Sequence, residues 1–190
     1  GATMLEIRWH SRAGQGAVTG AKGLGSIVAE SGKQVQAFAF YGSAKRGASM
    51  TAYNRIDDEV ILNHEKYMSP DYVFILDPGL ALTDHFTANG KDTTKYIITT
   101  HLSKEDLISL VPELQDIKDR VFVLDCFQIA RDTIGKAIPN TPMLGAFMKV
   151  SGMYELDYFK EKMVSVLKKL PPNLIEANMV AIQRAYDEVH

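Results

Sequence analysis

Two glycines and a basic residue follow the first apolar segment of the chain, where Arg12 precedes Gly14 and Gly16. Residues 4–9 are predicted to form a buried strand, and the small residues after Gly16 begin a helix. A strand, a glycine turn and a helix place free backbone N–H groups and the positive end of a helix dipole at one point. That geometry favours an anion, most often a phosphate. We therefore predict a phosphate-recognising turn, with the charge of Arg12 beside it.

A second basic loop follows the next predicted strand, residues 35–40, and contains Tyr41, Lys45 and Arg46. In a doubly wound sheet, ligands gather beyond the carboxyl ends of the strands. If the first two strands are neighbours, both loops face one crevice, where three cations and an aromatic ring suit a polyphosphate with a stackable base. The alternative stays open that the glycines only permit a tight turn and that the cations are solvated.

Two familiar nucleotide motifs are not matched. The spacing of Gly14, Gly16 and Gly20 is close to the dinucleotide fingerprint. That fingerprint also expects an acidic residue at the end of the second strand to hold the ribose hydroxyls. Residues 37–41 contain no acid, and the G-x-x-x-x-G-K-[ST] loop is absent from the sequence. A nicotinamide cofactor is therefore disfavoured.

The sequence predicts no catalytic residue and no metal site. Its five histidines lack metal-ligand spacing, and no G-x-S-x-G turn supplies a nucleophile. Asp77 and Asp125 end apolar strands, where capping of the following turn or helix is the favoured interpretation. Cys126 is interpreted as a packed residue, and Asn178 as a locally satisfied polar group on the last helix.

Composition limits the class of protein further. The 190 residues carry a formal net charge of -2, so no global basic field indicates nucleic acid. No apolar run is long enough to span a membrane, and no signal-peptide pattern is found. A single cysteine cannot form an internal disulfide or hold an iron–sulfur cluster by thiolates. We expect a cytoplasmic protein, and we interpret residues 1–3 as a cloning remnant.

The elements that position these residues alternate between strands and helices. We predict an α/β fold: a single three-layer domain over residues 4–190, with a largely parallel Rossmann-like sheet, helices on both faces and a helical C-terminal part. Further strands are predicted at 48–56, 60–62, 72–77, 96–99 and 121–124, and helices at 17–31, 125–135 and 143–150. A helical stripe lies between residues 107 and 114, with Ser103 and Asp106 as a capping box. Asn173 and Glu176 are predicted to cap the last helix.

Four sequence blocks resemble one family in the correct order. Residues 6–17, with Arg12, Gly14, Gln15 and Gly16, are similar to the opening of the gamma subunit of pyruvate:ferredoxin oxidoreductase (pyruvate synthase). Residues 36–42, followed by 46–48, resemble its second block. Residues 138–146 resemble its third block, and residues 175–186 resemble its ending. The resemblance covers nearly the whole chain.

The resemblance implies a chain without a complete active site in a multi-subunit enzyme. Such enzymes oxidise a 2-oxoacid with thiamine diphosphate, pass electrons through [4Fe–4S] clusters to ferredoxin, and release acyl-coenzyme A and CO2. The thiamine site and the clusters belong to the alpha, beta and delta subunits, and the gamma-type domain helps to hold coenzyme A. Residues in the matching blocks are candidates for coenzyme A or subunit contact: Arg12, Gly14, Gln15, Gly16, Tyr41, Arg46, Gly47, Asn140, Thr141 and Met143.

The chain departs from the family pattern at three places. Ala13 stands where many relatives have a further glycine, which resembles the branch that acts on pyruvate and branched-chain 2-oxoacids. Ser11 replaces a common glycine, and Lys45 lies in a stretch that is usually acidic. Two alternative functions stay open: a purely structural docking subunit and a stand-alone nucleotide-binding reductase.

The resemblance generates a kinetic prediction for Arg46. If Arg46 binds a phosphate of coenzyme A, Arg46→Ala raises the apparent KM for coenzyme A about tenfold, the loss expected for a charge-assisted hydrogen bond. The thiamine-dependent decarboxylation half-reaction survives. Steady-state kinetics of the assembled complex measure both quantities. An unchanged KM removes Arg46 from the coenzyme A site.

Overall fold

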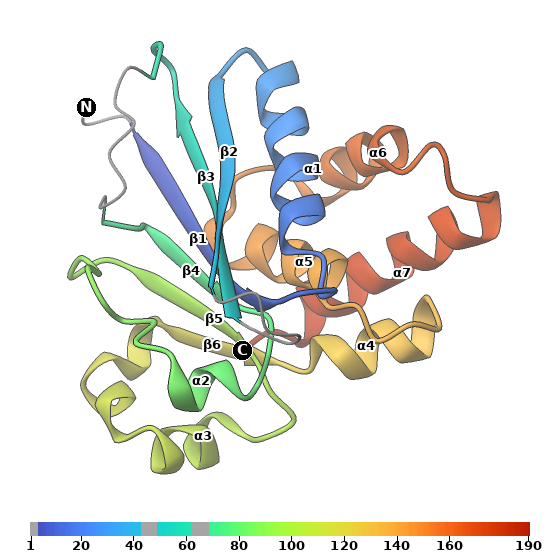
Figure 1. Cartoon of the computed structure of the whole chain (residues 1–190). Coiled ribbons are helices and arrows are strands. Elements are labelled where there is room, and N and C mark those ends of the chain that lie inside the picture. Colours follow the sequence, from blue (N-terminus) through green and yellow to red (C-terminus); the bar gives the residue numbers. More distant parts are fainter. Residues whose placement is uncertain (1–3, 43–48, 62–68) are drawn as a thin grey trace.

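The fold is built on one six-stranded sheet. The computed structural model describes residues 4–42, 49–61 and 69–190 (Figure 1). The strands lie in the order β2-β3-β1-β4-β5-β6. They are β1 (Leu5–Arg12), β2 (Gln34–Tyr41), β3 (Ser49–Asp57), β4 (Tyr72–Ile75), β5 (Lys95–Thr99) and β6 (Val121–Leu124). β1, β4, β5 and β6 run parallel, whereas β3 is antiparallel to both β1 and β2.

Helices cover both faces of this sheet. One face carries α1 (Ala17–Glu30), α4 (Cys126–Thr133), α5 (Asn140–Ser151), α6 (Leu156–Val166) and α7 (Pro172–Glu188) (Figure 1). The other face carries α2 (Leu80–Thr83), α3 (Lys104–Leu110) and the 3₁₀ segment η1 (Pro112–Arg120). The larger core includes Trp9, Phe74 and Phe147, and the smaller one includes Phe86 and Ile98. The predicted α/β class and the helical C-terminal part are confirmed.

The strand order corrects one expectation about the sheet. β3 pairs with both β1 and β2, so the first two strands of the chain are not neighbours. β1 also continues to Arg12, past the predicted end at Trp9. Val60 and Ile61 are not part of a strand, although residues 60–62 were expected to form one; Leu62 lies outside the described residues.

Three helix boundaries differ from the predicted ones. Asn173 does not cap α7, because the helix already begins at Pro172 and has no side-chain cap. α5 begins at Asn140, so Pro142 lies in its first turn, where a missing N–H does no harm. The stripe after Ser103 is divided into α3 and η1 by Pro112. The Ser103 side chain does accept the backbone N–H of Asp106, as expected for a cap.

A hydrogen-bonded chain joins β1 to β3 and α1. The Trp9 indole donates to Asn54 Oδ1 over 2.9 Å, and Asn54 Nδ2 donates to the carbonyl of Ala21 over 2.8 Å. All the side-chain atoms involved are buried, so the bonds also satisfy groups that would be costly to leave unpaired. They fix α1 against the middle of the sheet.

The opposite face of β1 carries a second polar group. Arg8 donates to the carbonyls of Phe86 and Ala88, and its Nε donates to His10 Nε2 over 2.9 Å. His10 Nδ1 lies 3.1 Å from Asp84 Oδ2. Since Nε2 accepts from Arg8, Nδ1 carries the proton and donates to Asp84, an assignment that rests on the partners. Burial lowers the pKa of His10, so the ring is neutral at pH 7.

Gly20 and Gly23 offer a matched test of helix packing within α1. A Cβ at Gly20 would lie 2.8 Å from Trp9 Cη2, whereas one at Gly23 would meet Val166 Cγ1 at 3.3 Å. Gly20→Ala is expected to lower the free energy of unfolding by about 1–3 kcal/mol through overpacking. Gly23→Ala is expected to be neutral or to raise it by up to about 1 kcal/mol, the gain in helix propensity. Urea denaturation of the chain measures both; equal effects would contradict the close contact with Trp9.

His10 generates a pH-dependent prediction. The folded pKa lies below the unfolded value of about 6.5, so the unfolded chain binds more protons as the pH falls through that value. The contribution of neutral His10 to stability is therefore complete above about pH 6.5 and declines below it. Urea denaturation at pH 7.5 and 5.5 should show a smaller loss of stability for His10→Gln than for the unaltered chain. His85→Gln, at an exposed position, is the control and should retain the full loss.

Candidate functional site

The turn between β1 and α1 presents backbone N–H groups without a side-chain cap. Gly14 and Gly16 have φ of 87° and 83°, in the left-handed region that favours glycine. Gly16 is the N-cap residue of α1, no side chain caps the helix, and its first turn holds no acidic residue. The N–H groups of Ala17, Val18 and Thr19 therefore remain available. Together with the helix dipole, they form the anion-binding geometry that the sequence predicted.

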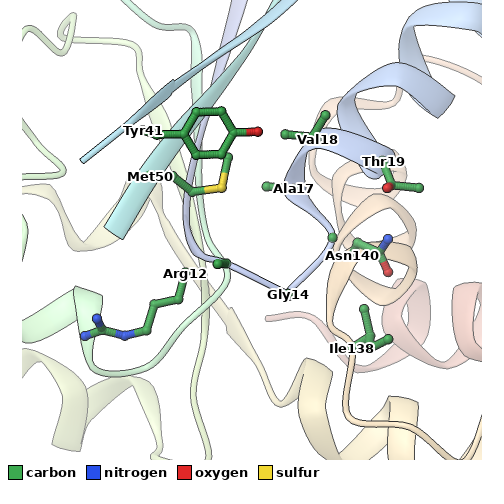
Figure 2. Close-up of a pocket in the computed structure, with 11 residues that line it drawn as sticks. Arg12, Gly14, Ala17, Val18, Thr19, Tyr41, Met50, Ile138 and Asn140 are labelled. Atoms are coloured by element: carbon green, nitrogen blue, oxygen red, sulfur yellow. The ribbon is translucent and has the colours of Figure 1, made fainter. Parts of the chain in front are cut away.

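A cavity of about 490 Å³ opens at this end of the helix; we call it the α1 cavity. Figure 2 shows Tyr41 and Met50 on one side of it and Ile138 and Asn140 on the other. The lining residues are Arg12, Ala13, Gly14, Gly16, Ala17, Val18, Thr19, Tyr41, Met50, Ile138 and Asn140. Tyr41 reaches the cavity although β3 separates its strand from β1. The α1 cavity thus brings together residues from the first block, from the third block and, through Tyr41, from the second block.

Arg12 and Gln15 hold the turn to the end of β4. Gln15 Oε1 accepts the backbone N–H of Arg12 over 2.8 Å, and Gln15 Nε2 donates to Asp77 Oδ2 over 2.7 Å. Arg12 Nε lies 3.5 Å from Asp77 Oδ1, which also accepts the N–H of Gly79. In Figure 2 the Arg12 guanidinium extends away from Ala17 and Val18. Its charge is therefore directed to Asp77, and the expected capping role of Asp77 is confirmed.

The three predicted residues of α5 occupy different environments. Asn140 Oδ1 accepts the N–H of Thr141 over 2.8 Å, and the rest of its side chain lies against Gly16. A Cβ at Gly16 would be 2.7 Å from Asn140 Cγ, so a glycine is needed for this close approach. The N-termini of α1 and α5 therefore meet at the cavity. Thr141 lines a second cavity, and Met143 is completely buried in the larger core.

The remaining candidates of the second block are only partly described. Tyr41 is 70% exposed at the end of β2 and lines the α1 cavity. Arg46 and Gly47 lie outside the described residues, as does Lys45. Thr19, Met50 and Ile138 line the cavity but were not selected from the sequence. Two of them could have been found from their positions in the sequence. Thr19 lies in the first helical turn after Gly16, and Ile138 lies two residues before Asn140.

The acidic and thiol side chains singled out in the sequence have structural partners. Asp125 Oδ1 accepts the N–H of Gln128 and caps α4. Cys126 is completely buried, and burial raises the pKa of its thiol to about 12. Within residues 4–42, 49–61 and 69–190, no group of His, Cys, Asp and Glu is arranged to hold a metal ion. No helix there is long and apolar enough to cross a membrane. The lining of the α1 cavity is suited to holding an anionic ligand.

Comparison with known proteins agrees with the resemblance in the sequence. Residues 6–188 match the family described as pyruvate ferredoxin/flavodoxin oxidoreductase. The pyruvate/ketoisovalerate oxidoreductases common subunit gamma of Thermococcus kodakarensis is 38% identical over 185 residues, which cover 97% of each chain. The crystal structure of pyruvate oxidoreductase subunit PORC from Thermotoga maritima is similar with a TM-score of 0.80 and 33% identity, over 99% of this chain and 98% of that one.

A more distant solved structure has the same fold. It is 2-oxoglutarate:ferredoxin oxidoreductase from Magnetococcus marinus, with 2-oxoglutarate, coenzyme A and succinyl-CoA bound. The TM-score is 0.74 at 16% identity, and the match covers 97% of this chain but 31% of that one. The family match spans nearly the whole sequence, and relatives above 30% identity are covered almost end to end. The chain therefore belongs to the pyruvate ferredoxin/flavodoxin oxidoreductase family.

Proposed function

We propose that this chain is the gamma subunit of a 2-oxoacid:ferredoxin oxidoreductase that acts on pyruvate, and that it contributes coenzyme A binding and subunit docking. Thiamine diphosphate and the [4Fe–4S] clusters belong to alpha, beta and delta partner subunits, with ferredoxin as electron acceptor. The observation that carries the ligand assignment is the uncapped N-terminus of α1 at a cavity of about 490 Å³.

The α1 cavity is chemically suited to the pyrophosphate of coenzyme A. Uncapped N–H groups at Ala17, Val18 and Thr19 can donate to phosphate oxygens. Asn140 accepts a hydrogen bond through Oδ1, whereas its Nδ2 makes none within the described residues. This Nδ2 lies beside Gly16 and offers a further donor to the phosphate. The coenzyme A in the Magnetococcus marinus enzyme supports the choice of this anion among phosphorylated ligands.

Docking is supported by a partly exposed aromatic cluster on β2 and β3. Phe38 stacks on Tyr53 with ring centroids 5.0 Å apart, and Phe40 packs edge-on against both rings. Phe40 is 38% exposed, and helices α2 and α3 lie over β4–β6, away from this part of the sheet (Figure 1). Exposed apolar patches of this kind mark sites of protein contact. A partner subunit is the proposed occupant of this surface.

Two substitutions at Thr19 test coenzyme A binding without weakening the fold. Thr19 is exposed in the first turn of α1 and lines the α1 cavity. Glu at this position favours the helix dipole by about 0.3–1 kcal/mol but repels a bound phosphate. Thr19→Glu is therefore expected to raise the apparent KM for coenzyme A about tenfold or more, equivalent to about 1.4 kcal/mol. Thr19→Gln, a neutral control of similar size, should remain within about twofold by the same scale.

The measurement is steady-state kinetics of the complex, purified anaerobically with each variant chain in place. Subunit composition and thermal unfolding are measured on the same samples, and Thr19→Glu should be at least as stable as the unaltered chain. A normal KM in an intact Thr19→Glu complex would exclude the α1 cavity as the coenzyme A site and favour a purely structural docking subunit. A chain that purifies alone with a bound flavin or nicotinamide would overturn the subunit assignment itself.

A further inference from the structure

Asn178 is a buried amide with an unused acceptor. It lies in α7 and is 5% exposed. Its Nδ2 donates to the carbonyl of Leu174, one turn earlier, over 2.7 Å. Its Oδ1 makes no hydrogen bond within the part of the chain that the structure describes. This oxygen is not one of the fully buried, unpaired polar atoms there, so some of its surface is accessible. The oxygen therefore opens onto the cavity that Asn178 lines. A buried polar atom in this position is costly unless a water or a ligand pairs with it.

That cavity, which we call the α7 cavity, has a volume of about 250 Å³. Leu167, Leu170 and Leu174 supply apolar walls, and Asn140, Asn178 and Lys136 supply the polar groups. It shares Asn140 and Ile138 with the α1 cavity, so the two are neighbours along one surface. A single elongated ligand can occupy both, with its anionic part at the N-terminus of α1.

Asn178 is fixed in orientation by the backbone. It presents its Oδ1 to the α7 cavity, because its Nδ2 donates to the carbonyl of Leu174. The cavity thus combines one buried acceptor with aliphatic walls. Adenine is a flat apolar ring with an exocyclic amino donor, which an amide oxygen can accept.

We propose that the α7 cavity binds the adenosine 3′-phosphate end of coenzyme A, with Asn178 Oδ1 accepting from the adenine amino group and Lys136 near the 3′-phosphate. This inference rests on the function proposed above. Lys136 has no carboxylate partner within the described residues, so its charge is available to an anion. The reactive thiol lies at the opposite end of coenzyme A and must reach partner subunits. The non-reacting end is therefore the one that a pocket within this chain can retain.

The test uses the assembled complex, with adenosine 3′,5′-bisphosphate and pantetheine as competitive probes against coenzyme A. Asn178→Leu keeps nearly the same side-chain shape but removes the acceptor, and it is expected to raise the inhibition constant of the bisphosphate about tenfold, as for a lost hydrogen bond to a ligand. Inhibition by pantetheine should not change. Lys136→Gln, at an exposed position, should reduce the preference for coenzyme A over dephospho-coenzyme A about tenfold or less. Lys118→Gln, on the opposite side of the sheet, is the control for net charge.

The outcomes separate this inference from the proposed function. If Thr19→Glu raises the KM for coenzyme A but Asn178→Leu and Lys136→Gln leave the bisphosphate and dephospho-coenzyme A results unchanged, the adenosine assignment is wrong and the function stands. If the variants weaken inhibition by pantetheine and not by the bisphosphate, the pantetheine part of coenzyme A lies in the α7 cavity. That result would also overturn the adenosine assignment. If no variant alters any coenzyme A constant, both proposals fail. Should Asn178→Leu prevent assembly, the exposed Lys136→Gln variant decides alone.

Discussion

The close approach of α1 to β1 and α5 is the constraint on which the rest of the structure depends. Gly20 allows the helix to lie against the Trp9 ring, and Gly16 allows the side chain of Asn140 to fill the space beside the turn. A Cβ at either position would come within 3 Å of these side chains, so any other residue there would force Asn140, Trp9 or the backbone to shift. The same approach leaves the first turn of α1 open at the α1 cavity. Packing and site are therefore produced by the same contacts.

β1, which packs against α1, is also tied to its neighbour β3 by a buried ion pair. On the face away from α1, Glu6 and Arg55 form a buried ion pair over 2.9 Å and tie β1 to β3, and the Arg55 guanidinium lies 4.8 Å from the Phe38 ring centroid. Burial raises the pKa of Glu6, against the lowering effect of Arg55. Buried pairs contribute little net stability, but breaking one is costly. Glu6 and Arg55 are direct partners in the register of β1 against β3, so the pair is satisfied only in that register. The neighbour of β3, β2, carries Phe38 and Phe40 of the aromatic cluster.

Local chemistry could be predicted from the sequence, and long-range order could not. Asp77, Asp125 and Ser103 cap the turns and helices expected of them, because a cap depends on residues two or three positions away. The insertion of β3 between β1 and β2 depends on pairing across the sheet, which no local pattern records. Asn173 failed as a cap because the helix starts at Pro172 and its N-cap position is Pro171, two residues before Asn173.

In the candidate site, too, the local features could be predicted from the sequence and the long-range contacts could not. The glycine turn was predicted because left-handed backbone and an open helix start have sequence signals, whereas the pairing of Gln15 with Asp77 spans 62 residues and had none. That pairing, with Arg12 beside the same carboxylate, changes what the site can use to hold an anion. A lone cation would bind a phosphate through full charge, but here the charge of Arg12 is shared with Asp77. Among the described residues that line the α1 cavity, further attraction comes from the partial charges of the backbone N–H groups, about half an elementary charge in all, and from the amide of Asn140. Such a site depends on geometry more than on net charge, which fits a chain whose formal charge is -2.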